Sequence, residues 1–185
     1  MEISAFLVQA INGLAGASSL FLVAAGLSLI FGVTRVVNFA HGSFFMLGVY
    51  LAYSLVAHAS PWLRPYAPNL VVFLALVFCA GLVTGAVGAA FEVVILRRIY
   101  QAPELFQLLA TFALALVVQD ATLWLWGPED LLGPRAPGLE GAVNIFGRLI
   151  PSYDLFLMGV GPLVLWALWY VLRHSRFGLL VRAAT

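Results

Sequence analysis

The sequence contains no lysine, and all nine of its basic side chains are arginines. This absence excludes one class of protein at once. A P-loop ATPase needs a lysine that reaches the β- and γ-phosphates of the nucleotide. The chain therefore cannot hydrolyse ATP in this way, and any ATP-driven work must come from a partner protein.

Charge of either sign is also scarce. Charged residues make up 9% of the chain and hydrophobic residues 63%, with a mean hydropathy of +1.04. A soluble globular domain carries roughly 25% charged residues, because its surface must face water. The formal net charge is only +1, and no basic stretch predicts nucleic-acid binding. The single cysteine, Cys79, can form no internal disulfide. The composition thus indicates a surface that faces lipid.

Five apolar segments are long enough to cross a bilayer, since a transmembrane helix needs about 20 mostly apolar residues. We predict an all-α, polytopic membrane bundle that forms a single transmembrane domain over residues 1–185. The predicted spans are about 5–33, 42–58, 69–92, 105–126 and 153–172. The region 34–42 is a candidate for a discontinuous helix.

The arginines predict the orientation, because basic residues gather on the cytoplasmic side. They cluster at Arg97 and Arg98 after the third span and at Arg173, Arg176 and Arg182 after the fifth. With both clusters in the cytoplasm, 127–152 is an external loop and the N-terminus is external. Pro and Gly gather in 127–138, which we predict to lack regular structure. Arg35 alone fixes the first turn, where a re-entrant segment would reverse the N-terminus.

Polar residues concentrate where the first two spans meet. The sequence there reads V-T-R-V-V-N-F-A-H-G, with Asn38 and His41 ahead of Gly42. Polar groups in a bilayer are expensive and normally face protein or a water-filled cavity. Transporters break helices at such places and turn the exposed N-termini of half-helices towards substrate carboxylates. A plain cytoplasmic turn, with Asn38 as a helix cap, explains the same residues equally well.

The run V-V-N-F-A-H-G-S-F-F-M-L-G-V-Y at 36–50 resembles the branched-chain amino acid ABC transporter permeases of the LivH type. The likeness continues in E-V-V-I-L-R-R-I-Y at 92–100, L-A-T-F-A-L-A-L-V-V-Q-D-A at 109–121, W-G-P-E-D-L-L-G-P at 126–134 and R-F-G-L-L-V-R-A-A-T at 176–185. It runs from about residue 10 to the end and covers the N-terminal portion of such permeases. We therefore expect the chain to be a C-terminally truncated permease, either a fragment or the product of a truncated reading frame.

The resemblance implies a permease subunit of an ATP-binding-cassette importer in the bacterial inner membrane, which translocates branched-chain amino acids or related amides or urea. It implies ATPase subunits, a second permease subunit, an external substrate-binding protein and the lipid bilayer as partners. The candidate substrate-path residues are Asn38, Phe39, Ala40, His41, Gly42 and Thr111. The segment 173–185 would begin the cytoplasmic coupling segment, with Arg173, Arg176, Gly178 and Arg182 as candidate ATPase-coupling residues.

Two other functions fit the residues. In an ion-driven secondary transporter, His41, Glu92 and Asp120 would be the candidate proton-coupling groups. Alternatively, the chain would be a membrane assembly subunit that does not itself transport. Glu92 is more simply expected to pair with Arg97 or Arg98 at the inner interface. No metal-ligand spacing or Ser/His/Asp arrangement occurs, so we predict no catalytic residue, no metal and no cofactor.

Overall fold

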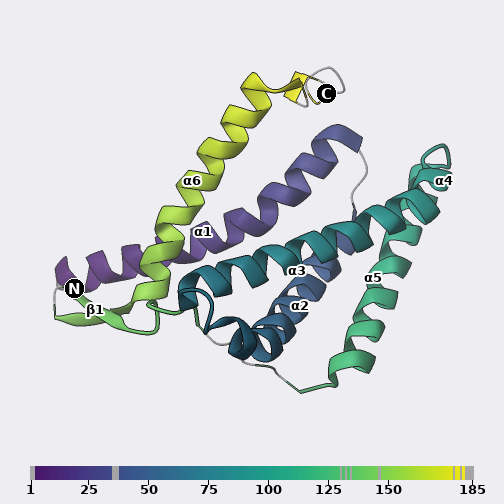
Figure 1. Cartoon of the computed structure of the whole chain (residues 1–185). Helices are drawn as coiled ribbons and strands as arrows, with labels where there is room; N and C mark the ends of the chain where they lie inside the picture. The colour runs from purple at the N-terminus through teal and green to yellow at the C-terminus, as the bar shows by residue number, and fades with distance from the viewer. Residues whose placement is uncertain are drawn as a thin grey trace. The chain divides into compact units, whose positions relative to one another are not determined.

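The computed structural model describes residues 3–34, 38–129, 131, 133, 135–145, 147–176, 178, 179 and 181. Within this part of the chain, five helices are long and apolar enough to cross a membrane (Figure 1). The predicted all-α polytopic fold is therefore confirmed. The chain divides into two compact units, one made of Met1–Arg35 and Arg135–Thr185 and the other of Val36–Pro134.

The unit Val36–Pro134 is built around α2 (Ala40–Leu63), which packs against both α3 (Asn69–Phe91) and α5 (Glu104–Trp126). Phe44 near the start of α2 meets Phe91 at the end of α3, so these two helices are antiparallel. Tyr50, further along α2, meets Trp126 at the end of α5. Because Ala40 packs on the middle of α5, α2 and α5 run in the same direction. Three successive membrane crossings require this alternation.

The helix that begins as α3 does not end at Phe91. It continues through a π-helical turn, η1 (Glu92–Leu96), into the short α4 (Arg97–Ile99), so that one helical span covers Asn69–Ile99. At 1.5 Å per residue this span is about 46 Å long, whereas the hydrocarbon core is roughly 30 Å thick. The helix therefore tilts in the membrane or carries its arginine-bearing end beyond the core.

A proline precedes three of the spans and sets where each begins. Pro68, Pro103 and Pro151 lie directly before α3, α5 and α6 (Ser152–His174), with ψ angles of 140°, 146° and 132°. Proline has no N–H and cannot continue a preceding helix, but its fixed φ suits the entry into a new one. These boundaries therefore follow from the sequence itself.

In the other unit, α1 (Ile3–Thr34) packs along α6. They approach closely at Gly161 and Ser18, where a Cβ added to Gly161 would lie 2.9 Å from Ser18 Oγ. Small residues at such a crossing let two membrane helices approach closely. Gly81, Gly85 and Gly88, the small-residue stripe of α3, have no such neighbour among the described residues.

A β-hairpin that the sequence did not predict lies between Gly141 and α6. Its strands β1 (Ala142–Ile145) and β2 (Arg148–Pro151) are antiparallel, with Ile145 paired to Arg148 across the turn. Gly147 in that turn has a φ of 79°, a conformation that favours glycine. The hairpin is fixed to its unit through Ile150, which is 1% exposed, and β2 contacts both α1 and α6.

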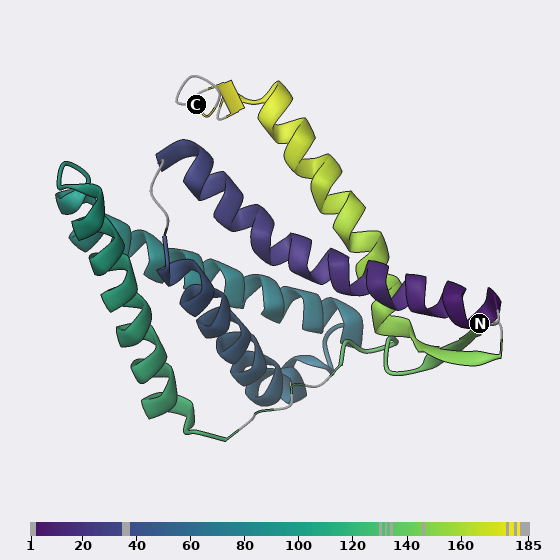
Figure 2. The ribbon, with the colours of Figure 1, turned by 180° about the vertical axis from the view of Figure 1, so that it is seen from behind.

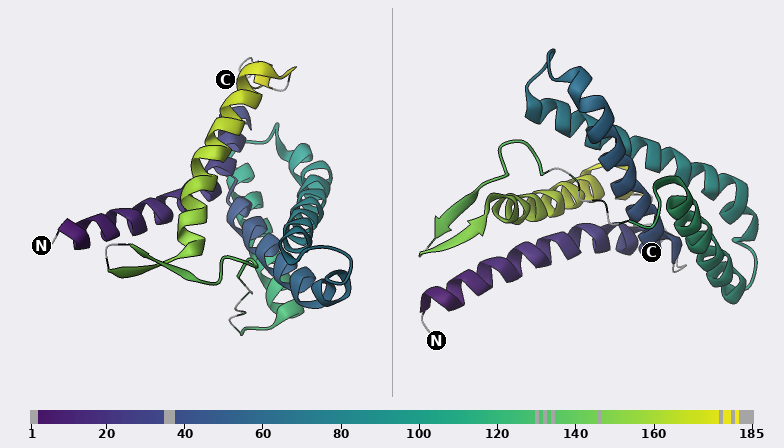
Figure 3. Two further views of the ribbon diagram at one scale, coloured as in Figure 1. Left: turned by 60° about the vertical axis from the view of Figure 1, so that its left-hand side comes forward. Right: turned by 90° about the horizontal axis from the view of Figure 1, so that it is seen from below.

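The hairpin marks the end at which both α1 and α6 begin. The N-terminal end of α1 lies beside it, and α1 and α6 then run towards the same side (Figures 2 and 3). This parallel direction is what a first and a fifth crossing must share when every helix between them crosses once.

Candidate substrate-path and coupling sites

The polar motif lies at the start of α2, where Asn38 forms a helix cap. Asn38 Oδ1 accepts a hydrogen bond from the backbone N–H of Ala40 at 3.0 Å, and the Asn38 carbonyl accepts one from the N–H of His41 at 3.2 Å. This is the capping role that the sequence left open, since asparagine satisfies N–H groups at helix starts in this way. Among the described residues, the side-chain amide nitrogen of Asn38 has no hydrogen-bond partner.

Of the residues that follow Asn38, some pack against α5 and others are exposed. Ala40 is 0% exposed and packs against Leu114 and Val118. Phe39 is 52% exposed, and its ring meets the ring of Phe112 edge-on, 6.4 Å between centroids. His41 is half-buried and Gly42 is exposed. The postulated break at 34–42 falls partly on residues 35–37, which lie outside the described part of the chain.

Thr111 belongs to a buried stripe along α5. The stripe consists of Gln107, Thr111, Leu114, Val118 and Thr122. Thr111 is 2% exposed, and its hydroxyl donates a hydrogen bond to the carbonyl of Leu108 at 3.0 Å. The structure therefore places Thr111 on the α2-facing side of α5, about one turn from the residues that pack on Ala40.

Two helices indicate how deep the start of α2 lies. Trp126 Nε1 at the end of α5 donates a hydrogen bond to Ser54 Oγ of α2 at 2.6 Å, so these two residues share a level. The distance from that level back to Ala40 along α2, or back to Leu114 along α5, is roughly 20 Å at 1.5 Å per residue. Tryptophans at helix ends commonly mark a membrane boundary. If Trp126 marks one boundary of a core about 30 Å thick, these lengths would put the start of α2 within the core.

Sequence reasoning missed Gln107, a buried side chain near the start of α5. Gln107 is 7% exposed, and its Nε2 donates hydrogen bonds to the carbonyls of Tyr100 and Ala102 at 3.1 and 2.8 Å. It thereby ties the α4–α5 turn to α5. Its Oε1 is buried without a hydrogen-bond partner in the described structure. The i, i+4 spacing of Gln107 and Thr111 was the available signal, because it places two polar residues on one helix face.

The acidic residues lie in different settings. Glu92, at the start of η1, accepts a hydrogen bond from the Tyr100 hydroxyl at 3.4 Å; within the described residues it forms no ion pair with Arg97 or Arg98, contrary to expectation. Burial first, and then the Glu92 carboxylate, raise the pKa of the Tyr100 phenol above 10.0, so it stays a donor at neutral pH. Asp120 lies on the exposed side of α5, away from the stripe that holds Thr111.

The candidate coupling residues follow a sharp end of α6. Ser175 is extended, with φ −103° and ψ 157°, and its Oγ accepts a hydrogen bond from the N–H of Gly178 at 3.0 Å. This is a capping contact for the helical residues that follow. A Cβ on Gly178 would collide with the Leu172 backbone, so glycine lets the chain fold back there. Arg182 lies outside the described residues.

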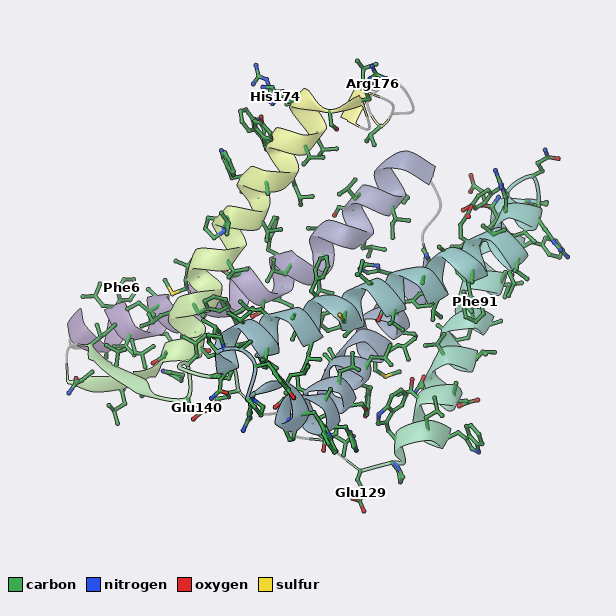
Figure 4. All side chains as sticks on the ribbon, viewed as in Figure 1. Phe6, Phe91, Glu129, Glu140, His174 and Arg176 are labelled. Carbon is green, nitrogen blue, oxygen red and sulfur yellow. The ribbon has the colours of Figure 1, made fainter. Side chains whose placement is uncertain are left out.

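Arg173 and Arg176 have different environments at the C-terminal end of α6. The Arg173 guanidinium lies over the Trp169 ring, 5.3 Å from its centroid, while Arg176 is exposed beyond the helix end (Figure 4). Among the described residues, no group of three or more His, Cys, Asp or Glu side chains could hold a metal ion. The described sites are therefore the start of α2, packed on α5, and a basic segment after the end of α6.

These features define a multi-pass α-helical membrane protein. The chain matches the family described as "Branched-chain amino acid transport system / permease component" over residues 9–185, and it belongs to that family.

Individual relatives are similar over nearly the whole chain. The permease protein BraD of the high-affinity branched-chain amino acid transport system of Pseudomonas aeruginosa is 27% identical over 185 residues, which is 98% of this chain and 60% of BraD. The LivH permease proteins of the corresponding Salmonella typhimurium and Escherichia coli systems are 25% identical over 181 residues, 96% of this chain and 58% of each LivH. The chain thus spans about 60% of the length of these relatives. No solved structure gives a significant match.

Proposed function

We propose that this chain is a membrane-spanning portion of a permease subunit of an ATP-binding-cassette importer that translocates branched-chain amino acids. The observation that carries the proposal is the family match over residues 9–185. The names of BraD and LivH supply the substrate class. Because the chain has no lysine for a P-loop, ATP hydrolysis falls to partner subunits. A second permease and an external binding protein complete the assembly.

The proposed topology places the N-terminus outside the bacterial inner membrane. Arg97 and Arg98 then face the cytoplasm, as the distribution of basic residues favours. Two features support this arrangement. The alternating directions of α2, α3 and α5 put the α4–α5 turn at the same end as the start of α2, and the parallel α1 and α6 both begin beside the hairpin. The hairpin and the loop 127–152 are then external.

The start of α2 is the proposed substrate-path segment. N–H groups at a helix start carry partial positive charge and suit a carboxylate, and the Asn38 amide nitrogen is an additional donor there. The open surface of Phe39 offers an apolar contact beside Phe112. His41, Gly42 and Thr111 lie at the same α2–α5 junction. A zwitterionic amino acid with an apolar side chain complements this combination.

The segment after Ser175 is the proposed ATPase contact. Arg173 lies at the end of α6, where this contact begins; Arg176 and Gly178 lie in the segment, and Arg182 follows in the sequence. Because Ser175 caps the helical residues directly after α6, a displacement of this segment would be transmitted to α6. Nucleotide binding on the partner would in this way change the packing of α6 against α1 and open the path to alternate sides.

Uptake of radiolabelled leucine into proteoliposomes tests this function. The vesicles would hold the complex purified from its native membrane, with the binding protein outside and ATP supplied to the ATPase side. We expect uptake to require ATP and the binding protein, and to be unchanged by a protonophore. Uptake that persists without ATP and collapses with the protonophore would contradict the proposal and favour an ion-driven carrier.

A further inference from the structure

The C-terminal end of α6 carries a ladder of aromatic and basic side chains. Trp166 stacks on Tyr170 with 5.7 Å between ring centroids, and Tyr170 stacks on His174 with 4.6 Å. Beside this row, Arg173 covers the Trp169 ring at 5.3 Å, and Trp169 meets His174 edge-on at 6.0 Å. These contacts arrange the five side chains, here called the α6 ladder, over the last turns of the helix.

The α6 ladder faces away from α1. The positions of α6 that are buried or half-buried in this part recur at helical spacing, at Gly161, Val164, Leu168 and Leu172. Gly161 is also where α6 touches α1. The ladder occupies the opposite side of the helix, where Trp166, Trp169 and Tyr170 are 59%, 49% and 50% exposed. Within its own unit, this face is open.

The charge at this end has one sign. Arg173 and His174 close α6, and Arg176 follows directly after it (Figure 4). The only acidic residue of α6, Asp154, lies in its first turn at the other end of the helix. The sequence of α1, the helix packed against α6, contains no charged residue from Ile3 to Thr34. Neither α1 nor the C-terminal half of α6 therefore carries a carboxylate that could neutralise the arginines.

We propose that the α6 ladder binds the phosphate headgroup of an anionic phospholipid at the membrane boundary. The apolar part of α6 ends at Leu172, which puts Arg173 and His174 at headgroup level and the ladder tryptophans just below it, where aromatic rings prefer to lie. A guanidinium can present two parallel N–H donors to phosphate oxygens. The inference rests on the membrane-spanning role of α6 and is independent of the transported substrate.

The contacts within the ladder hold both polar groups ready for this ligand. Arg173 is already positioned by the Trp169 ring, so less side-chain freedom is lost on binding. His174 Nδ1 lies 3.2 Å from the Tyr170 carbonyl, and because a carbonyl only accepts, that nitrogen carries the hydrogen. Nε2 is then the ring nitrogen left for an outside partner. The bound headgroup would fix the end of α6 immediately before the proposed ATPase contact.

Lipid retention measured by native mass spectrometry tests the proposal. The purified chain would be reconstituted in nanodiscs of phosphatidylcholine with a minor fraction of phosphatidylglycerol, and the lipids that stay bound on release would be counted. We expect phosphatidylglycerol to be enriched on the wild-type chain. One arginine near an anionic surface accounts for about a fivefold preference, so Arg173→Gln should reduce the enrichment by about that factor. Trp169→Leu, which keeps Arg173 and His174, should reduce it as well.

Arg148→Gln is the matched control, because it removes an arginine from β2, at the opposite end of α6. It should leave the enrichment unchanged. Equal enrichment in the wild type and Arg173→Gln would overturn the proposal, and so would an equal loss in Arg148→Gln, which would show a non-specific charge effect. Cross-linking of a photoreactive residue at position 169 to a protein subunit, with no lipid adduct, would assign the face to a protein partner instead. Lipid retention is measured without leucine uptake, so failure of this proposal can be distinguished from failure of the proposed function.

Discussion

Polar side chains within the spans mostly bond to their own helix. The hydroxyls of Ser18, Thr84 and Thr122 each donate to the carbonyl four residues earlier, at 2.9, 2.8 and 2.7 Å. Such local bonds satisfy a hydroxyl where no water is available, so these residues carry no functional signal. Gln107 and Asn38 differ, because each bonds across a turn. Replacing either residue should therefore disturb the start of a helix rather than a single hydroxyl bond.

Replacing Asn38 separates capping from substrate binding. Asn38→Ala removes the acceptor for the Ala40 N–H and should destabilise the protein by about 1 kcal/mol, the usual value of a cap. Asn38→Ser keeps a capping oxygen and removes the amide donor, so stability should stay near that of the wild type. If the amide contacts substrate, leucine uptake should fall in both variants. Thermal unfolding in mild detergent and uptake by the complex measure the two effects; wild-type uptake in Asn38→Ser would contradict the contact.

Helix pairing is fixed by a few specific contacts, which the sequence does not identify. The spans themselves were predictable, because length and apolar composition suffice to locate them. Their neighbours were not, because the spans are apolar on nearly every side and show no periodicity that separates a protein-facing from a lipid-facing side. The β-hairpin was missed because its strands of four residues each follow a Pro- and Gly-rich stretch. The predicted third span ends at residue 92, because Glu92, Arg97 and Arg98 suggest a membrane boundary there. In the structure the helix continues through η1 to Ile99.

The contact between α1 and α6 can be tested by enlarging the side chain at position 161 and removing the one at position 18. Gly161→Ala would bring a Cβ within 2.9 Å of Ser18 Oγ and 3.0 Å of Ser18 Cβ. We expect a loss of about 1–3 kcal/mol from overpacking. Ser18→Gly removes both atoms, so the double variant should recover part of that loss. Thermal unfolding of the four proteins gives the coupling energy, and additive losses would show that these helices do not meet there.

The C-terminal end of α5 is joined to α2 by the Trp126–Ser54 hydrogen bond. Trp126→Phe and Ser54→Ala should each lower stability by about 0.6–1.7 kcal/mol, the range measured for bonds between membrane helices. The double variant should lose little more than the worse single one, because both changes remove the same bond. Trp124→Phe is a suitable control, since Trp124 is 84% exposed. Full additivity would contradict the parallel pairing of α2 and α5.

At the scale of the whole molecule, apolar surface greatly exceeds what the chain buries within itself. The described core is confined to small clusters, around Ala40 and around Val56, and large apolar side chains are exposed along every span. Lipid can cover such surface, and so can further helices of a permease assembly. The sequence indicated the family through the N-F-A-H-G motif, and the missing lysine led us to expect ATP hydrolysis on a partner protein. It left the role of Asn38 open, because a cap and a substrate contact require the same residue type.

The central claim is that this chain assembles with an ATPase, and its most direct test is purification of the tagged chain from its native membrane in mild detergent. Mass spectrometry would identify the proteins that remain bound. We predict recovery of a P-loop ATPase and a second permease subunit, and loss of the ATPase but not the permease in Arg176→Glu, which reverses the charge in the proposed coupling segment. Recovery of neither partner, from a preparation that shows the wild-type unfolding transition, would contradict the account.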